Sequence, residues 1–359
     1  MSVNHNLYSV FEQHFPADRS RPFIIAVDGK AVSYAAMEAS SAQLANSLVA
    51  LGLQPGQRVA VQLQKSAAAL MLYLACVRAG LVYLPLNTGY TATELAYFFE
   101  DASPSLIVGD LPLVRDTSTQ SLLQQLAGQY QSRYESLAID GNGSLQQRAA
   151  AEPDCFSTVL SRADDLAAIL YTSGTTGRPK GAMLSHHNLT SNALTLKDCW
   201  GWTSRDVLLH ALPIFHVHGL FVACHCVLAA GAAMIMLPKF DVGKVIEQLP
   251  QATVLMGVPT FYTRLVDSPA FSAELCKDMR LFISGSAPLL AQTHAQFEQC
   301  SGHRILERYG MSETGMLISN PLIGERRAGT VGLPLPGVEV RVVDDINTPM
   351  PVGRWVQFR

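Results

Sequence analysis

The sequence has few charged residues and no long run of one charge. Asp, Glu, Lys and Arg make up 15% of the 359 residues, the formal net charge is −3, and the 26 basic residues form no cluster along the chain. Proteins that bind nucleic acid usually gather positive charge on one face. The composition therefore predicts no nucleic-acid partner. Hydrophobic residues, at 48%, predict a globular chain with a large core and apolar pocket walls.

Signals for disulfides, secretion and membrane insertion are also missing. The seven cysteines are odd in number and scattered, which favours reduced thiols and a cytoplasmic protein. The N-terminus has no basic head followed by an apolar core, so no secretory signal is visible. Residues 207–238 contain no Asp, Glu, Lys or Arg, but His, Pro and Gly interrupt the run, and a membrane span needs about 20 consecutive apolar residues. We expect a buried helix and a core strand there, with no membrane span.

Short apolar runs alternate with helical patterns along most of the chain. RVAVQL, SAAALMLYLACVRAG and LVYLPLN, within residues 58–87, are typical of strand, helix and strand in a β-α-β unit. Similar alternation continues to HRILERYG at 303–310, which predicts a doubly wound α/β fold with parallel sheets flanked by helices. A polar, Gln-rich stretch from about 117 to 153 breaks the pattern, and we interpret it as a surface excursion or a boundary.

The segment YTSGTTGRPKG, residues 171–181, places glycines, hydroxyls and two cations in a loop between two strands. Glycines let backbone N–H groups approach an anion closely, and the hydroxyls and cations add donors and charge. The spacing differs from the common G-x-x-x-x-G-K-[ST] nucleotide loop because Pro179 precedes Lys180. The alternative is a solvated turn that closes a hairpin. The density of donors favours a phosphate-binding loop.

A second polar segment, YGMSETG at 309–315, follows the strand predicted in HRILERYG. Ligands of open α/β sheets bind at strand carboxyl ends, so both segments can face one crevice. Glu313, between the hydroxyls of Ser312 and Thr314, suits an oxygen-preferring cation such as Mg²⁺. Tyr309 can stack on a base. A lone carboxylate at a strand end is more often an ordinary surface residue, but the pairing with the first segment favours a site.

These motifs, together with LPIFHVHG and GTVGLPLPG, occur in the order seen in the adenylate-forming acyl-CoA synthetase superfamily, which the whole chain resembles. LPIFHVHGLFVA, MGVPTFYTRL and LFISGSAPL make it most similar to the malonyl-CoA synthetases within that superfamily. The resemblance implies an ATP-dependent acid-thiol ligase: a carboxylate attacks the α-phosphate of ATP, and the thiol of CoA then displaces AMP. It also implies the large N-terminal domain of the superfamily, ending in a small β-rich subdomain.

The resemblance assigns roles to individual residues. Lys180 and Glu313 are implied in catalysis, with Glu313 as the Mg²⁺ ligand, and His216 is implied at the acyl end, where it gates thiol access. Ser312 is implied to contact the α-phosphate and Tyr309 to pack on adenine. The other residues implied in binding ATP are Thr172, Ser173, Gly174, Thr175, Thr176, Gly177, Gly285, Ser286, Ala287, Gly310 and Met311.

A dicarboxylate such as malonate or methylmalonate needs a partner for the carboxylate that does not react. Arg264, a cation in an otherwise apolar stretch, is the candidate, because a guanidinium matches a carboxylate bidentately. Ser284 and His216 can add hydrogen bonds. The alternative is that Arg264 extends to the surface from a helix. His216, His218, Cys224 and Cys226 raise the further alternative of a zinc site, but buried thiols and one gating histidine fit this spacing better.

The resemblance divides the chain into residues 1–160, an α/β subdomain; 161–325, a second α/β subdomain with the nucleotide loops; and 326–359, the start of the β-rich subdomain. Relatives continue into a smaller C-terminal domain that carries a lysine which promotes adenylation, and no such residues follow Arg359. We therefore expect a truncated ligase that binds ATP but has impaired malonate activation. The alternatives are an inactive ATP- or AMP-binding remnant and a synthetase for another small acid. The partners expected are ATP, the acid and CoA, and the sequence does not indicate an oligomeric state.

Overall fold

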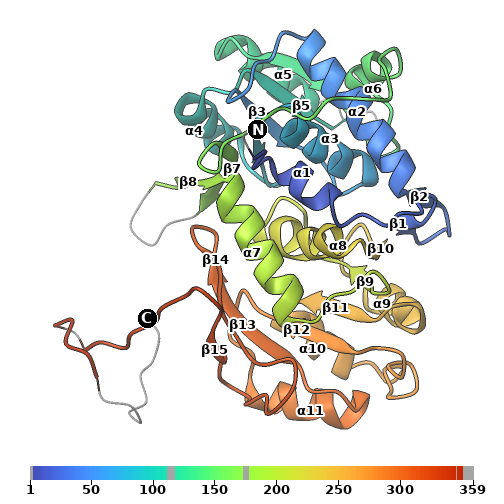
Figure 1. The fold of residues 1–359 in the computed structure, drawn as a ribbon, viewed down its shortest axis with the longest axis vertical. Coiled ribbons are helices and arrows are strands. Elements are labelled where there is room, and N and C mark those ends of the chain that lie inside the picture. Colours follow the sequence, from blue (N-terminus) through green and yellow to red (C-terminus); the bar gives the residue numbers. More distant parts are fainter. Residues whose placement is uncertain (1–2, 111–117, 173–177, 345, 351–359) are drawn as a thin grey trace.

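The computed structural model contains two mostly parallel sheets surrounded by helices (Figure 1). It describes residues 3–110, 118–172, 178–344 and 346–350. This arrangement confirms the α/β fold expected from the alternation of apolar runs. Within the described ranges, no helix has the length and apolar character required to cross a membrane.

One sheet has six strands. They are β3 (Arg58–Gln62), β4 (Val82–Pro85), β5 (Leu106–Gly109), β6 (Arg133–Ser136), β7 (Leu166–Thr172) and β8 (Lys180–Ser185). Their order is β6-β5-β3-β4-β7-β8, and neighbours are parallel except in the β7–β8 hairpin. The connecting helices are α3 (Ala67–Arg78), α4 (Ala92–Ala102), α5 (Ser118–Gln129) and α6 (Ser144–Ala149).

The other sheet has nine strands. They are β1 (Pro22–Ala26), β2 (Ala31–Ser33), β9 (Val207–His210), β10 (Ala233–Met236), β11 (Val254–Gly257), β12 (Leu281–Ser284), β13 (Leu306–Met311), β14 (Gly315–Ser319) and β15 (Leu333–Pro334). Their order is β15-β14-β13-β12-β11-β9-β10-β1-β2. The strands from β13 to β1 are parallel, and the hairpin partners at both edges are antiparallel.

The remaining helices flank the sheets or pack between them. They are α1 (Leu7–Glu12), α2 (Tyr34–Ala50), α7 (His186–Cys199), the π-helix η1 (His218–Cys224), α8 (His225–Ala230), α9 (Val242–Gln248), the 3₁₀ turn η2 (Leu249–Gln251), α10 (Pro259–Val266) and α11 (Ala291–Ser301). Ser185 caps α7: its hydroxyl accepts a hydrogen bond from the Asn188 N–H, and the Asn188 side chain accepts one from the Ser185 N–H.

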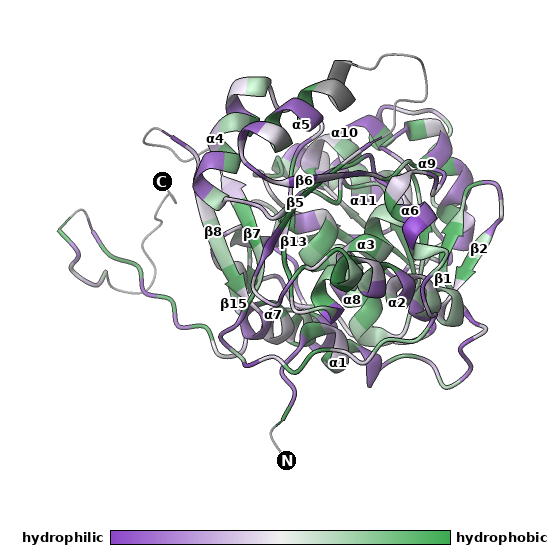
Figure 2. Cartoon of the chain, turned by 90° about the horizontal axis from the view of Figure 1, so that it is seen from above, coloured by the Kyte–Doolittle hydropathy of each residue, from purple (hydrophilic) through white to green (hydrophobic). Residues whose placement is uncertain are grey.

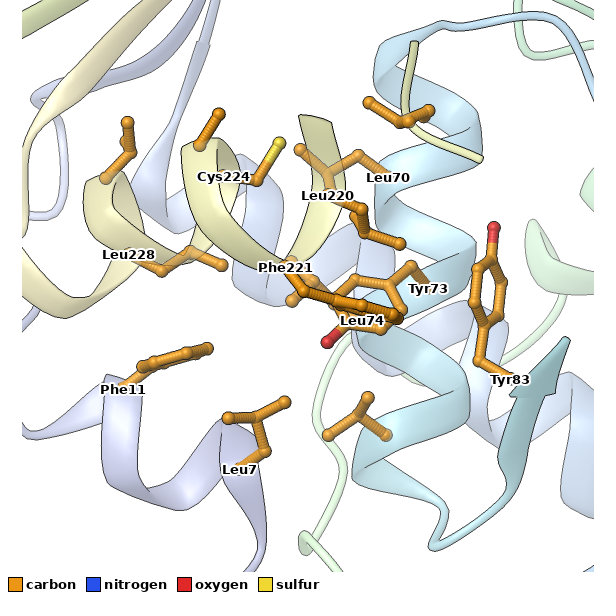
Figure 3. Close-up of a cluster of buried hydrophobic side chains, with 14 of the residues drawn as sticks. Leu7, Phe11, Leu70, Tyr73, Leu74, Tyr83, Leu220, Phe221, Cys224 and Leu228 are labelled. Carbon is orange, nitrogen blue, oxygen red and sulfur yellow. The ribbon is translucent and has the colours of Figure 1, made fainter. Parts of the chain in front are cut away.

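The largest core cluster extends from one sheet to the other through the helices between them. Hydrophobic residues dominate the central strands and helices α3 and α8 (Figure 2). Figure 3 shows Leu7 and Phe11 of α1, Tyr73 of α3 and Phe221 of η1 meeting in this core. The uncharged stretch 207–238 is thus a strand, two buried helical segments and a second strand, so the expected buried helix and core strand are confirmed.

The interpretation of residues 117–153 as an excursion was wrong. The stretch contains α5, β6 and α6, and β6 extends the six-stranded sheet by pairing in parallel with β5. Few apolar residues are needed, because a peripheral helix and an edge strand each bury a single face. Leu123, Leu126 and Leu145 supply that contact.

Sheet membership also crosses the boundary expected near residue 160. β1 and β2 pair with β10 in the nine-stranded sheet, whereas β7 and β8 join β4 in the six-stranded sheet. After residue 326, the described residues contain only β15 and one bridge between Val343 and Pro349. The described part of the chain near the C-terminal end extends away from the body of the molecule (Figure 1).

Candidate active site

The β7–β8 hairpin presents the first polar segment at the carboxyl end of β7. Thr172 is paired with Lys180, so these residues are the last paired positions before the turn. Thr172 is half-buried and Lys180 is exposed. The other predicted phosphate-binding residues of this loop lie outside the described residues: Ser173, Gly174, Thr175, Thr176 and Gly177.

Two side chains of helix α4 form hydrogen bonds with this hairpin. The Tyr171 hydroxyl donates to the Asp101 carboxylate at 2.5 Å, and the Tyr97 hydroxyl donates to the Pro179 carbonyl at 2.9 Å. Burial, with the Asp101 carboxylate as a further cause, raises the pKa of Tyr171. Helix α4 therefore contacts the hairpin in β7 and directly before β8.

The second polar segment forms the β13–β14 hairpin. Tyr309, Gly310 and Met311 belong to the end of β13, and residues 312–314 form the turn. A Cβ on Gly310 would lie 2.3 Å from the Gly315 carbonyl oxygen, so the close approach of the two strands requires glycine there. Glu313 is exposed at the tip.

The two polar segments meet, as the sequence predicted. The Thr172 hydroxyl donates a 3.1 Å hydrogen bond to Oε1 of Glu313. Next to this contact, a cavity of about 360 Å³ lies between α7 and the β13–β14 hairpin. Its walls include Asn188, Val217, Phe221, Glu313 and Pro336.

A third loop follows β12. Ser286 and Ala287 are exposed, and Ser286 has a positive φ of 70°, which is unusual for a residue other than glycine. Gly285 lies directly under the Arg308 side chain: a Cβ there would be 2.4 Å from the guanidinium carbon. The loop is therefore exposed at residues 286–287 and depends on glycine at 285.

Arg308, on β13, is a buried cation. Its exposed fraction is 3%, and Nε and Nη2 have no hydrogen-bond partner among the described residues. Burial lowers the pKa of the guanidinium to about 10, so it stays charged near neutral pH. A buried charge is costly unless it is paired. The surroundings of Arg308 are thus suited to an anionic ligand.

Two histidines lie near this cation. His218 is buried; its Nδ1 is 3.2 Å from the Ser286 hydroxyl, and its Nε2 has no partner among the described atoms. His216 is exposed, and its Nδ1 accepts a hydrogen bond from the His218 backbone N–H at 3.2 Å. Desolvation, followed by the charge of Arg308, lowers the pKa of both rings. Near neutral pH both histidines are therefore uncharged.

Ser284 and Arg264, the other residues predicted to bind a carboxylate, have different surroundings. Ser284 is 1% exposed at the end of β12, and its hydroxyl has no hydrogen-bond partner within the described structure. Arg264 is exposed near the end of α10, with its guanidinium carbon 5.0 Å from the centroid of the Phe240 ring. Sequence reasoning did not identify Arg308; the available signal was an arginine in a strand expected to be buried.

The cysteine and histidine pairs weighed as a zinc site have other contacts. Cys224 Sγ lies 3.2 Å from Nε2 of His210, and burial raises the pKa of Cys224 to about 12. Across the described ranges, no group of three or more His, Cys, Asp or Glu side chains is placed to hold a metal ion. These cysteines therefore act as buried, protonated thiols in the core.

Comparison with known proteins agrees with this geometry. The family model for AMP-binding enzymes matches residues 11–354. The chain belongs to the AMP-binding enzyme family. It is 33% identical to a malonate–CoA ligase of Arabidopsis thaliana, covering 98% of this chain and 63% of that protein. A mitochondrial malonate–CoA ligase of Mus musculus is 38% identical over 74% of this chain and 47% of its own length.

Solved structures give the same result. ATP-bound MatB from Rhodopseudomonas palustris is 52% identical, with a TM-score of 0.93 over 98% of this chain and 69% of that one. A malonyl-CoA ligase with methylmalonyl-CoA and AMP bound is 30% identical, with a TM-score of 0.76 over 94% of this chain and 69% of that one. The chain thus has the fold of the N-terminal part of these enzymes, and it spans less than two thirds of the Arabidopsis ligase.

Proposed function

We propose that the chain binds ATP and a small dicarboxylic acid, malonate or methylmalonate, and activates the acid for transfer to the thiol of CoA. The observation that carries this proposal is the buried Arg308, whose Nε and Nη2 have no partner among the described residues. The substrate class agrees with the malonate–CoA ligases to which the chain is similar.

Joining a carboxylate to the α-phosphate of ATP brings two anions together. Cations and oriented donors must offset their repulsion and stabilise the charge that develops on the phosphate. We assign this role to Lys180 and the Thr172 hydroxyl, with Ser312 at the α-phosphate and Tyr309 against adenine. Gly285, Ser286 and Ala287 border the nucleotide through the exposed loop after β12.

Glu313 is the residue that fits Mg²⁺. Its carboxylate is exposed and accepts a hydrogen bond from the Thr172 hydroxyl. Hard cations such as Mg²⁺ prefer oxygen ligands. Since no cluster of three acidic or imidazole side chains is formed by the described residues, the remaining ligands would be nucleotide oxygens and water. The ion would supply charge neutralisation on the phosphates.

Arg308 is the residue that we assign to the unreactive carboxylate of the acid. Its planar guanidinium can pair with a carboxylate through two hydrogen bonds. Because Arg308 is buried, these hydrogen bonds would be stronger than the same bonds formed in water. Ser284 and His218 offer further unsatisfied polar atoms on neighbouring segments. Arg264, which the sequence predicted for this role, is exposed and lies over the Phe240 ring. Binding of the carboxylate by Arg264 therefore stays a separate proposal.

His216 is proposed at the acyl end of the site. His216 is exposed, and its lowered pKa keeps the ring neutral near neutral pH, so the ring can either accept a hydrogen bond from the acyl group or donate one to it. CoA as the thiol substrate and the cytoplasm as the compartment are predictions that follow from the family resemblance and from the reduced cysteines.

Calorimetric titration tests the proposed function. The chain is titrated with ATP in the presence of Mg²⁺, and the complex is then titrated with malonate, methylmalonate or acetate. We expect ATP to bind and malonate to bind at least tenfold more tightly than acetate, because acetate has no second carboxylate. Absence of ATP binding, or equal affinity for malonate and acetate, would contradict the proposal.

A further inference from the structure

The side-chain amide of Asn192, on α7, pairs with the backbone of Met316, on β14. Its Nδ2 donates to the Met316 carbonyl at 2.9 Å, and its Oδ1 accepts the Met316 N–H at 3.1 Å. In a β-sheet, a neighbouring strand would form hydrogen bonds with the same N–H and C=O groups of a residue. Asn192 thus substitutes for a strand partner and links the helix to the strand.

Helix α7 connects the two polar hairpins of the site. It starts directly after β8, where Ser185 caps it, so it follows the first hairpin without a linker. Further along the helix it lies against β14 of the second hairpin (Figure 1). Asn192 is therefore placed to transmit the position of one hairpin to the other.

The packing at Gly315 indicates how closely the amide is fitted. Gly315 has a positive φ of 66°, and a Cβ there would lie 2.9 Å from both Cγ and Oδ1 of Asn192. Gly315 pairs with Met311 across the turn. The residues between them, 312–314, include Ser312 and Glu313. The turn is therefore fixed on the β14 side by the contacts of Asn192.

We propose that Asn192 is a positioning residue that holds the β13–β14 turn so that Ser312 and Glu313 meet the metal-bound phosphates. Asn192 itself touches neither phosphate nor metal in this proposal, which rests on the proposed function. A shift of about 1 Å in a side chain that binds a charged group is enough to weaken binding severely. Loss of the two amide hydrogen bonds frees the turn to make such a shift.

The test compares Asn192→Ala with Asp198→Ala, a control at an exposed position of the same helix. Mg·ATP affinity is measured by calorimetry, and backbone hydrogen exchange is followed at residues 312–316 without ligand. We expect N192A to bind Mg·ATP at least tenfold more weakly and to exchange faster in this segment. D198A is expected to match the wild type in both measurements.

A second variant separates a specific effect of Asn192 from a general loss of protein stability. Gly315→Ala places a methyl group against the Asn192 amide, so it should also weaken Mg·ATP binding. Removing the amide relieves this clash, although the strain of a positive φ remains. The effect of G315A on Mg·ATP affinity should therefore be smaller in the N192A background than in the wild type.

The outcomes separate this proposal from the proposed function. Equal Mg·ATP affinity in N192A and wild type, or strictly additive effects of N192A and G315A, would overturn the positioning role alone. Wild-type protein that did not bind Mg·ATP would overturn the proposed function, and the positioning role that rests on it.

Discussion

The hydroxyl of Thr172 donates a 3.1 Å hydrogen bond to Oε1 of Glu313, which joins the β7–β8 hairpin of one sheet to the β13–β14 hairpin of the other. Thr172 is the last residue of β7, and Glu313 lies in the turn between β13 and β14. The contact orients the carboxylate that we assign to Mg²⁺.

Replacing Thr172 by valine should weaken Mg·ATP binding about three- to tenfold, because the Glu313 carboxylate loses a donor at an exposed site, where charge-assisted bonds contribute less than when buried. Thr172→Ser keeps the hydroxyl and serves as the control. Calorimetric titration of both variants with Mg·ATP measures the effect. Equal affinities of the two variants would show that the hydroxyl does not matter.

Gly285→Ala should disrupt the carboxylate pocket. The added Cβ would lie 2.4 Å from the Arg308 guanidinium carbon, so this side chain must move. We expect malonate affinity to fall at least tenfold. Gly128→Ala, on the exposed face of α5 with nothing within 4 Å, is the control and should leave malonate affinity unchanged. Normal malonate binding by G285A would mean that the position of Arg308 is unimportant.

The free energy of unfolding should fall as the pH drops from about 6.5 to about 4. Burial lowers the pKa of His186 from 6.5 to about 4, against the opposing charge of Asp165, and its Nδ1 accepts the Leu7 N–H at 3.0 Å. The unfolded chain takes up a proton in this interval and the folded chain does not, which destabilises the fold by on the order of 3 kcal/mol. Denaturant titrations at several pH values should show a shallower pH dependence for His186→Gln. An unchanged dependence would exclude His186 as its cause.

Arg280→Met should lower the free energy of unfolding by about 3–5 kcal/mol, since it leaves the Asp206 carboxylate buried without its cation. Arg280 donates to both Asp206 oxygens, at 2.6 and 2.9 Å, and Asp206 is 3% exposed. Arg304→Met breaks a solvent-exposed ion pair with Glu298 and should cost less than about 1 kcal/mol. Urea unfolding compares the two, and similar losses would contradict the role of burial.

The sequence was sufficient to predict that the two polar segments share a crevice, because both follow strands of an α/β pattern and ligands bind at strand ends. The Thr172–Glu313 contact confirms this. The same reasoning misread residues 117–153, since α5 and β6 bury few apolar side chains and so carry little periodic signal. Local pattern is weakest where an element packs on one side at the edge of a sheet.

There is a physical reason why the sequence did not predict a role for Arg308. Glu307 and Arg308 are adjacent on β13, so their side chains point to opposite faces of the sheet, and sequence alone does not show what covers each face. In the structure both are buried: Glu307 accepts the Gly329 N–H, while Arg308 reaches across Gly285 toward the histidines. Arg264 was preferred because its neighbours are apolar, but they are one face of an amphipathic helix with the arginine on its exposed side.

The most direct test of the account is the ratio of malonate to acetate affinity in wild type, Arg308→Met and Arg264→Met, measured by titration of the ATP complex. We predict that R308M loses about 100-fold in malonate affinity with little change for acetate, because only malonate has the second carboxylate that Arg308 pairs with. R264M should keep most of the preference for malonate. An unchanged malonate-to-acetate ratio in R308M would contradict the proposal that the chain selects a dicarboxylate through this buried arginine.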